Sequence, residues 1–236
     1  MSKIRNASVM IAAVGGLSVA SVAQAKIVEN DLTGNVQFDG WDSLGGLAGY
    51  GIGEVGPFAP PATAWPAPVG SMEAGSGDAI LNRTFGTHYS ASFSLYSFAG
   101  PSGFIVGDSS AISDLANVVF TIADWVGSSP STAPVLSYNG GTQSLAADFS
   151  FSSPFGSVDF GGPIDVSART FQWDLSGISG ITDFSIAWTA GSSAGITGLQ
   201  LEQSDVFSVA SANVIPHPST ALVVLGAGLV ARRRRA

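Results

Sequence analysis

The feature that most constrains the fold is a regular alternation of apolar and polar residues, which recurs along the chain after residue 78. In residues 88–98, HYSASFSLYSF, aromatic or aliphatic side chains alternate with serines. The same period of two appears in residues 169–175, 183–189 and 197–203. Because successive side chains of a β-strand point to opposite faces, this pattern predicts strands with one buried face.

Five further segments have the composition of short strands: residues 35–39, 79–85, 117–125, 134–138 and 145–151. Turn-forming sequences such as Ser-Pro, Asn-Gly-Gly and Gly-Gly-Pro separate them, and no window has the pattern of a long amphipathic helix. We therefore expect an all-β domain, a two-sheet antiparallel sandwich of jelly-roll-like type, over residues 26–203. Within it, the Gly- and Pro-rich residues 45–77 are expected to form a long loop.

Composition and charge narrow the classes of function. Apolar residues make up 45% of the chain, enough for a real core, and there is no cysteine to form disulfides or thiolate metal sites. Between Lys26 and Ile215, three basic residues face all 17 acids, a net charge of −14. Such a domain repels phosphate backbones, which excludes nucleic acid as a partner, whereas neutral sugars and divalent cations remain compatible.

The first 25 residues have the organisation of a secretory signal peptide. Lys3 and Arg5 precede an apolar segment over Val9–Val19, and Ala23 and Ala25 occupy the small-residue positions of a cleavage site. The apolar segment is too short for a permanent membrane span. We therefore expect signal peptidase to cleave after Ala25.

The C-terminal end combines three features of a membrane-handling signal, preceded by an expected linker over residues 204–215. Pro216 and Pro218, with His217 between them, block regular secondary structure. The apolar run over residues 221–231 favours lipid and predicts a short transmembrane helix. Translocation is expected to stop at the basic cluster that follows, which stays on the cytoplasmic side: Arg232, Arg233, Arg234 and Arg235.

In the order of these parts, residues 216–236 resemble the PEP-CTERM protein-sorting signal. In that family a Pro-Glu-Pro motif, a short transmembrane helix and an arginine cluster are recognised by an exosortase, a membrane transpeptidase-like enzyme. The resemblance implies a Gram-negative-type bacterium, cleavage near the proline motif, and release or attachment at the cell surface, often beside extracellular polysaccharide. Two features depart from the family pattern. His217 replaces the usual Glu, and Ser219–Ala231 has 13 residues, about 20 Å as a helix against about 30 Å of hydrocarbon.

Two sequence patterns imitate catalytic motifs without the context that their chemistry needs. Gly51–Gly56 fits the dinucleotide fingerprint, but three closely following prolines exclude the required helix. Gly191–Gly195 fits the nucleophile-elbow pattern, but the only later histidine is His217, in the predicted sorting motif. His88, the single histidine of the predicted mature domain, cannot build a multi-histidine zinc site and is expected at a strand start beside a polar neighbour.

Carboxylates are the remaining source of chemistry. Asp39, Asp42, Asp159 and Asp165 lie in or near predicted turns. A facing pair of acids would serve glycoside hydrolysis, and turn carboxylates with carbonyls would hold calcium. Surface acids also keep exported proteins soluble, which is the interpretation that we prefer. We therefore expect neither catalytic residues nor a metal or other cofactor, with calcium as the alternative.

The tryptophans divide into two groups. Trp125, Trp173 and Trp188 lie on strand patterns and are expected in the core. Trp41 and Trp65 lie in Gly- and Pro-rich surroundings. They are the candidates for carbohydrate contact through an exposed stacking platform, against the alternative that they anchor their loops.

These features together predict an exported, non-enzymatic protein of the cell envelope, cell surface or extracellular matrix. Its expected partners are signal peptidase, an exosortase-like processing enzyme, the membrane through the C-terminal helix, and exopolysaccharide. A carbohydrate-binding module and a secreted polysaccharide-cleaving enzyme are the two alternatives.

Overall fold

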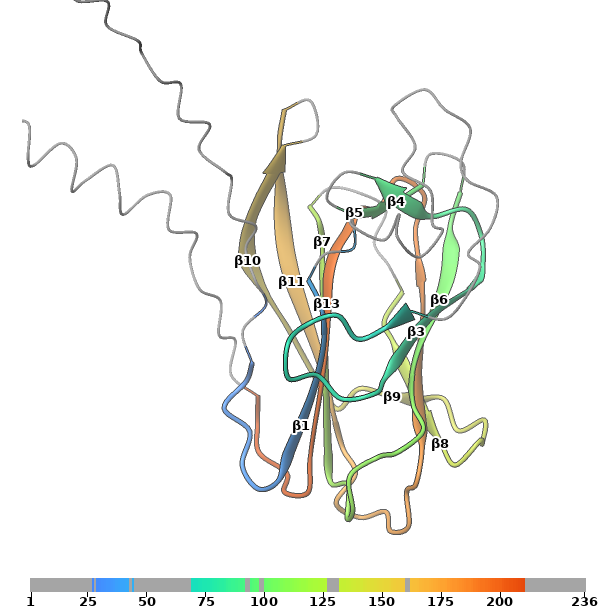
Figure 1. Ribbon diagram of the computed structural model, residues 1–236, viewed down its shortest axis with the longest axis vertical. Helices are drawn as coiled ribbons and strands as arrows, with labels where there is room; N and C mark the ends of the chain where they lie inside the picture. Colours follow the sequence, from blue (N-terminus) through green and yellow to red (C-terminus); the bar gives the residue numbers. More distant parts are fainter. Residues whose placement is uncertain are drawn as a thin grey trace, which may run out of the picture.

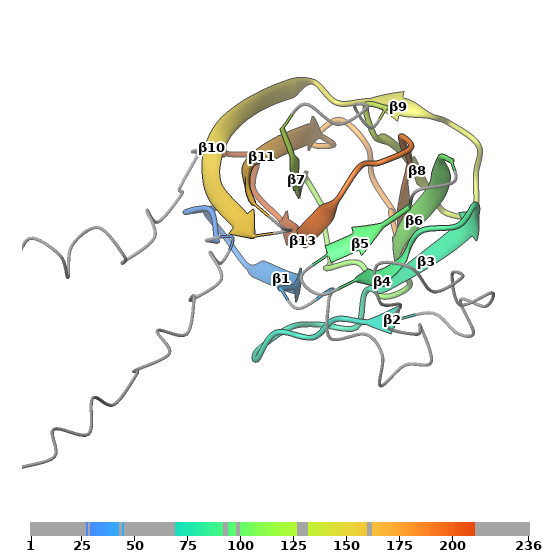
Figure 2. The same ribbon diagram turned by 90° about the horizontal axis from the view of Figure 1, so that it is seen from above.

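The computed structural model describes Ile27, Leu44 and residues 29–42, 69–91, 94–97, 100–126, 132–159 and 162–210. Within them, strands β1 to β13 form two antiparallel sheets that face each other (Figures 1 and 2). The predicted all-β, two-sheet antiparallel architecture is thereby confirmed. In the same part of the chain no helix is long and apolar enough to cross a membrane; the predicted signal peptide and C-terminal helix lie outside the described residues.

The larger sheet has seven strands and is organised around β13. Its order is β10 (Phe149–Asp159), β11 (Pro163–Asp174), β7 (Asn117–Trp125), β13 (Ile196–Ser204), β5 (Ser94–Tyr96) and β4 (Tyr89–Ala91). β1 (Val36–Trp41) pairs with β13 from Leu199 to Ser204, whereas β5 meets β13 at Ile196. The first and last strands of the domain are therefore neighbours.

The smaller sheet has six strands. Its order is β2 (Val69–Gly70), β3 (Ile80–Phe85), β6 (Ser102–Asp108), β12 (Phe184–Ala190), β8 (Val135–Tyr138) and β9 (Leu145–Ala146). β12 and β6 form its centre, and the two-residue strands β2 and β9 form its edges. Such short edges offer few unpaired backbone groups to other chains.

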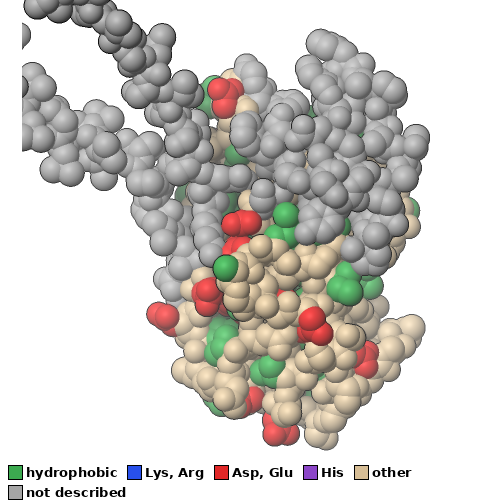
Figure 3. All heavy atoms as spheres, viewed as in Figure 1, with side chains coloured by type: hydrophobic (Ala, Val, Ile, Leu, Met, Phe, Trp, Pro, Cys, Tyr) green, Lys and Arg blue, Asp and Glu red, His purple; other side chains and the backbone are tan. Residues whose placement is uncertain are grey.

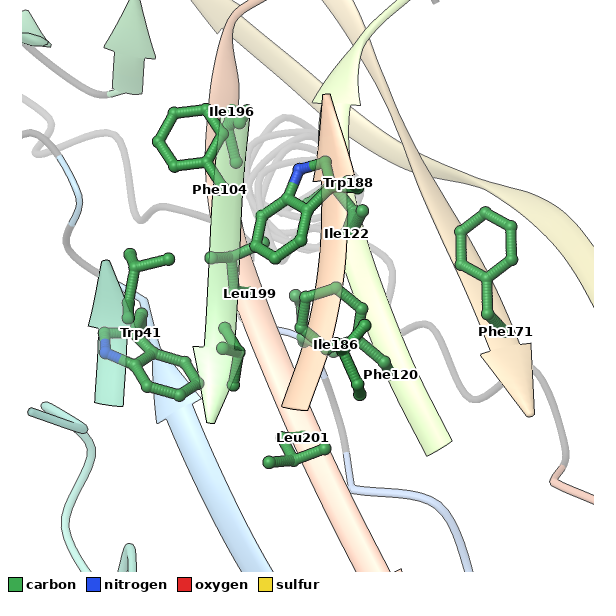
Figure 4. Close-up of a cluster of buried hydrophobic side chains, with 14 of the residues drawn as sticks. Trp41, Phe104, Phe120, Ile122, Phe171, Ile186, Trp188, Ile196, Leu199 and Leu201 are labelled. Atoms are coloured by element: carbon green, nitrogen blue, oxygen red, sulfur yellow. The ribbon is translucent and has the colours of Figure 1, made fainter. Parts of the chain in front are cut away.

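The core lies between the sheets and is built from inward residues of both (Figure 4). Trp188 of β12 stacks on Phe104 of β6, with ring centroids 5.5 Å apart. The same indole lies 5.0 Å from the ring of Phe120, on β7 of the other sheet. The alternating residues of these strands thus meet across the sandwich, as the period of two predicts.

Several element boundaries differ from the sequence prediction. Residues 117–125 form one strand as predicted, but residues 88–98 contain two antiparallel strands, β4 and β5. β6 was not predicted, because its outward residues are glycine and isoleucine rather than polar residues. β2 lies inside the segment 45–77, so the expectation of an entirely irregular loop there is wrong at Val69–Gly70.

The two ends of the described domain, near Ile27 and Ala210, cover the middle of the outer face of the seven-stranded sheet, where β7 and β13 are buried on both faces. On one side, the side chain of Ile27 lies against Gly198 and Asn30 bonds to Glu202. On the other, the carbonyl oxygen of Ser208 accepts hydrogen bonds from Asn117 and Gln172.

The C-terminal part of this cover corrects the predicted linker over residues 204–215. Ala210 is buried, and its backbone N–H donates to the Gln172 side chain over 3.0 Å. Residues 205–210 therefore belong to the folded domain, and a linker begins no earlier than residue 211. Residues 211–215 lie outside the described part of the chain.

Candidate functional site

All of the residues singled out in the sequence as processing sites lie outside the described residues: Ala23, Ala25, Pro216, His217, Pro218, Arg232, Arg233, Arg234 and Arg235. Trp65, one of the two proposed sugar-stacking residues, also lies outside them. Their roles remain predictions from the sequence.

Trp41, the other proposed stacking residue, lies in the core instead. Its side chain is fully buried, and its Nε1–H donates to the carbonyl oxygen of Val69 over 3.3 Å. The residue belongs to β1, which pairs with β13 along the sandwich interior. The expectation that Trp41 offers an exposed platform is therefore wrong, whereas the core positions expected for Trp125, Trp173 and Trp188 are confirmed.

His88 precedes β4 and forms a Ser–His pair with Ser102. Its Nδ1 lies 2.8 Å from Ser102 Oγ and its Nε2 lies 3.0 Å from the carbonyl oxygen of Ala194. Because a carbonyl oxygen only accepts, Nε2 carries the proton and Nδ1 accepts from the serine hydroxyl. Burial lowers the pKa of His88 to about 4.

In this pair the serine hydroxyl donates to a histidine nitrogen, as it does in an activated nucleophile, but a substrate could not reach the serine. Ser102 and His88 are both fully buried. Ser102 Oγ also accepts the backbone N–H groups of Thr87 and His88, over 2.9 and 3.0 Å. The serine therefore holds the turn before β4, in agreement with the polar neighbour predicted for His88.

Of the four acids proposed as chemical candidates, only Asp39 is buried. Asp42, Asp159 and Asp165 are exposed, and Asp159 accepts the N–H of Gly162 in the β10–β11 turn. Asp39 lies within β1 rather than in a turn. Burial raises the pKa of Asp39 to about 6, opposed by hydrogen bonds from the Ala79 N–H and the Gln37 side chain.

Next to Asp39, a polar network closes one end of the sandwich. Gln37 of β1 and Gln203 of β13 both donate to Asp108 Oδ2, at the end of β6. Ile112 N–H donates to Gln203 Oε1, which fixes the orientation of that amide. The network joins the two sheets, so these polar groups serve the fold.

Glu202 is the second carboxylate whose pKa is strongly raised. It lies on the outer face of the seven-stranded sheet, beneath the N-terminal segment, and is 1% exposed. Burial raises its pKa to about 7, while hydrogen bonds from Asn30 and Gln200 act in the opposite direction. Asp39 lies opposite Leu201 in the register and therefore points to the same face of the sheet as Leu201. Glu202, the next residue of β13, points to the other face, so the carboxyl groups of Asp39 and Glu202 cannot face each other.

The described part of the chain contains no group of three His, Asp or Glu side chains that could hold a metal ion. Arg83 and Arg169 are the only basic Lys or Arg side chains described. Arg83 donates to the carbonyl oxygen of His88, and Arg169 forms an ion pair with Asp124. Both arginines are thus engaged within the fold.

The outer face of the six-stranded sheet contrasts with all these buried sites, because it is accessible to solvent. We call it the open face; its outward positions, read from the strand register and burial, carry no ionisable side chain and are Gly70, Ile80, Asn82, Phe85, Gly103, Ile105, Gly107, Ser185, Ala187, Thr189, Val135, Ser137 and Ala146. Figure 3 shows acidic groups (red) scattered over one side of the molecule. The middle of the seven-stranded sheet is thus covered on its outer face, whereas the outer face of the six-stranded sheet presents uncharged positions to solvent.

Phe85 is the largest exposed aromatic group on the open face. A β-bulge between Arg83 and Phe85 places Phe85, rather than Thr84, opposite Gly103. The bulge sends Arg83 inward and Phe85 outward, although residues two apart on a regular strand share a face. Sequence reasoning missed this residue because the alternation of 79–85 gives no sign of the bulge.

Known proteins add no family assignment to these features. The chain matches no protein-family model, no curated protein and no solved structure. Its function is therefore inferred from its own residues.

Proposed function

We propose that this chain is an exported, non-catalytic component of the cell surface or extracellular matrix. It is built on a jelly-roll-type sandwich and is processed at both ends, by signal peptidase after Ala25 and by an exosortase-like enzyme near Pro216. The C-terminal helix holds the chain transiently in the inner membrane until that second cleavage.

The observation that carries this proposal is the position of the ends of the folded domain. Ile27, two residues after the predicted signal cleavage, is buried against the domain. Ala210, six residues before Pro216, is also buried. The packed unit therefore fits between the two predicted processing sites, so that both cleavages would leave it intact.

A non-catalytic role is supported by how the reactive groups are used. The Ser102–His88 pair is enclosed, and Asp108 is engaged by two glutamines that join the sheets. The two carboxylates with strongly raised pKa values, Asp39 and Glu202, lie on opposite faces of one sheet. The alternative of a polysaccharide-cleaving enzyme needs two facing acids, which this pair cannot supply.

The test is to follow the chain in producing cells with and without residues 216–236. We expect the intact chain to lose both end segments and to reach the cell surface, and the deletion variant to enter the medium without envelope attachment. A His217→Glu variant, which restores the family motif, should be processed at least as fast as the natural chain. The sorting role would be refuted if the natural chain and the deletion variant were found in the same place and their folded domains had the same mass.

A further inference from the structure

Most outward positions of the open face are half-buried or exposed, and none of them carries an ionisable side chain. The described residues carry 16 acidic side chains and two arginines, and both arginines are bonded within the fold. A cationic partner would be attracted to the acidic regions rather than to this face, and an anionic partner would be repelled by the whole domain. The charge pattern therefore favours a neutral ligand.

The exposed aromatic ring on this face is positioned by two sequence features. The bulge at Thr84 turns Phe85 outward, and Gly103 beneath it has no side chain. A Cβ on Gly103 would lie 2.3 Å from Phe85 Cε1, far inside contact distance, so only glycine lets the ring approach the sheet so closely. The ring lies close to the sheet, and Phe85 as a residue is 54% exposed.

The surroundings of Phe85 are polar but not charged. Thr189 lies opposite Gly103 in the adjacent strand, and Asn82 lies opposite Ile105. Ser185 and Ala187 continue the same face along β12. The same face also carries Ile80, which is 43% exposed, and the half-buried Ile105 and Val135. Contact with another protein is therefore the competing occupant, and the sedimentation measurement below tests for it.

A sugar ring has the complementary chemistry. Its C–H face is apolar and stacks on an aromatic ring, while its hydroxyl groups exchange hydrogen bonds with hydroxyl and amide side chains. A sheet face is extended along its strands and so suits several units of a chain better than one small molecule.

We propose that the open face binds a neutral polysaccharide, with Phe85 as the platform on which a sugar ring stacks. This inference rests on the proposed role at the cell surface, where such polymers occur. It assigns the contact to the sheet face rather than to the loop tryptophans considered from the sequence.

The experiment measures binding of the protein, purified in the form that the producing cells contain, to soluble polymers by affinity electrophoresis. The neutral probes are dextran, hydroxyethyl cellulose and galactomannan, and alginate is the anionic comparison. We expect retardation by at least one neutral polymer that persists at high salt, and none by alginate. Retardation by none of the neutral polymers, or by alginate alone, overturns the proposal.

Two variants locate the contact, and one serves as the matched control. Phe85→Ala removes the ring, and Ala187→Lys places a long charged side chain at the centre of the same face. Each should weaken binding about tenfold or more, as loss of a central contact does. Phe149→Ala removes the other phenylalanine that is exposed among the described residues, at the edge of the opposite sheet, and this variant should bind like the natural protein.

Two results would contradict the assignment. One is that both open-face variants bind the polymer as tightly as the natural protein does and unfold at the same temperature. The other is a polymer-independent change of sedimentation in them, which would identify the face as a contact between copies of the chain. Binding is measured on purified protein in whatever form the producing cells contain it, so its outcome does not depend on where the chain is located or cleaved. A failure of sorting therefore leaves binding intact, and a failure of binding leaves sorting intact.

Discussion

Asn30 and Glu202 are joined by two hydrogen bonds, although 172 residues separate them in the sequence. The backbone N–H and the side-chain amide of Asn30 donate to the two carboxylate oxygens of Glu202, each over 2.8 Å. Gln200 donates to one of the same oxygens. The buried carboxylate thus fastens the N-terminal segment to the last strand, and its raised pKa is a consequence of that position.

Replacing Glu202 by glutamine should flatten the pH dependence of stability. The pKa of this carboxyl is about 7 in the folded state and 4.5 by reference, so its favourable contribution is complete below pH 4.5 and is lost as the pH rises to 7. The shift corresponds to about 3 kcal/mol. In urea unfolding from pH 5 to pH 8, the free energy of unfolding of Glu202→Gln should therefore rise relative to that of the natural protein.

The control for this change is Gln143→Ala, an exposed residue between β8 and β9 whose side chain carries no titrating group. It should leave the shape of the pH profile unaltered. Parallel profiles for Glu202→Gln and the natural protein would show that the carboxyl does not change protonation in this range.

His88 should show the opposite pH dependence. Its pKa is about 4 in the folded state against 6.5 by reference, so its contribution to stability is complete above pH 6.5 and is lost as the pH falls toward 4. The direct measurement is the imidazole proton chemical shift of His88 by NMR, with a histidine peptide as reference. We expect the peptide to titrate near pH 6.5 while His88 stays neutral down to about pH 5. A titration of His88 near that of the peptide would contradict its burial.

The sequence predicts those strands whose two faces differ in polarity. Residues 184–190 alternate cleanly because Ile186 and Trp188 enter the core while Ser185 and Thr189 face outward. β6 escapes the same reasoning because glycine and isoleucine occupy its outward positions. Alternation reports a difference between faces, so a strand with a neutral, small-residue outer face gives little signal.

The candidate site was less predictable because it depends on pairing over long distances. Trp41 has glycine on one side and a Gly-rich segment beyond, which indicates a loop, but pairing with Leu199 makes it part of the core. Phe85 reaches the open face through a bulge that only the register with β6 reveals. Neither relationship is encoded in the residues next to Trp41 or Phe85 in the chain.

Gln172→Ala should release the C-terminal segment from the outer face of the seven-stranded sheet. The Gln172 side chain donates to Ser208 and accepts from the backbone N–H of Ala210, over 2.7 and 3.0 Å. Removing it leaves these backbone groups buried without that partner, at a cost of about 3 kcal/mol. Hydrogen exchange followed by mass spectrometry should show faster exchange in residues 205–210. The exposed Gln143→Ala is the control, and equal exchange in both variants would mean that Gln172 does not hold the segment.

Phe120→Ala tests the packing that joins the two sheets. Phe120 is fully buried on β7, and its ring lies 5.0 Å from Trp188 on the opposite sheet. Truncating it removes the largest part of this contact and leaves a cavity, so the free energy of unfolding should fall by about 3–5 kcal/mol. Phe149→Ala, which truncates a phenylalanine that is 44% exposed, should cost much less. Urea unfolding followed by far-UV circular dichroism compares the two variants. Similar losses in both would contradict a core in which Phe120 and Trp188 connect the sheets.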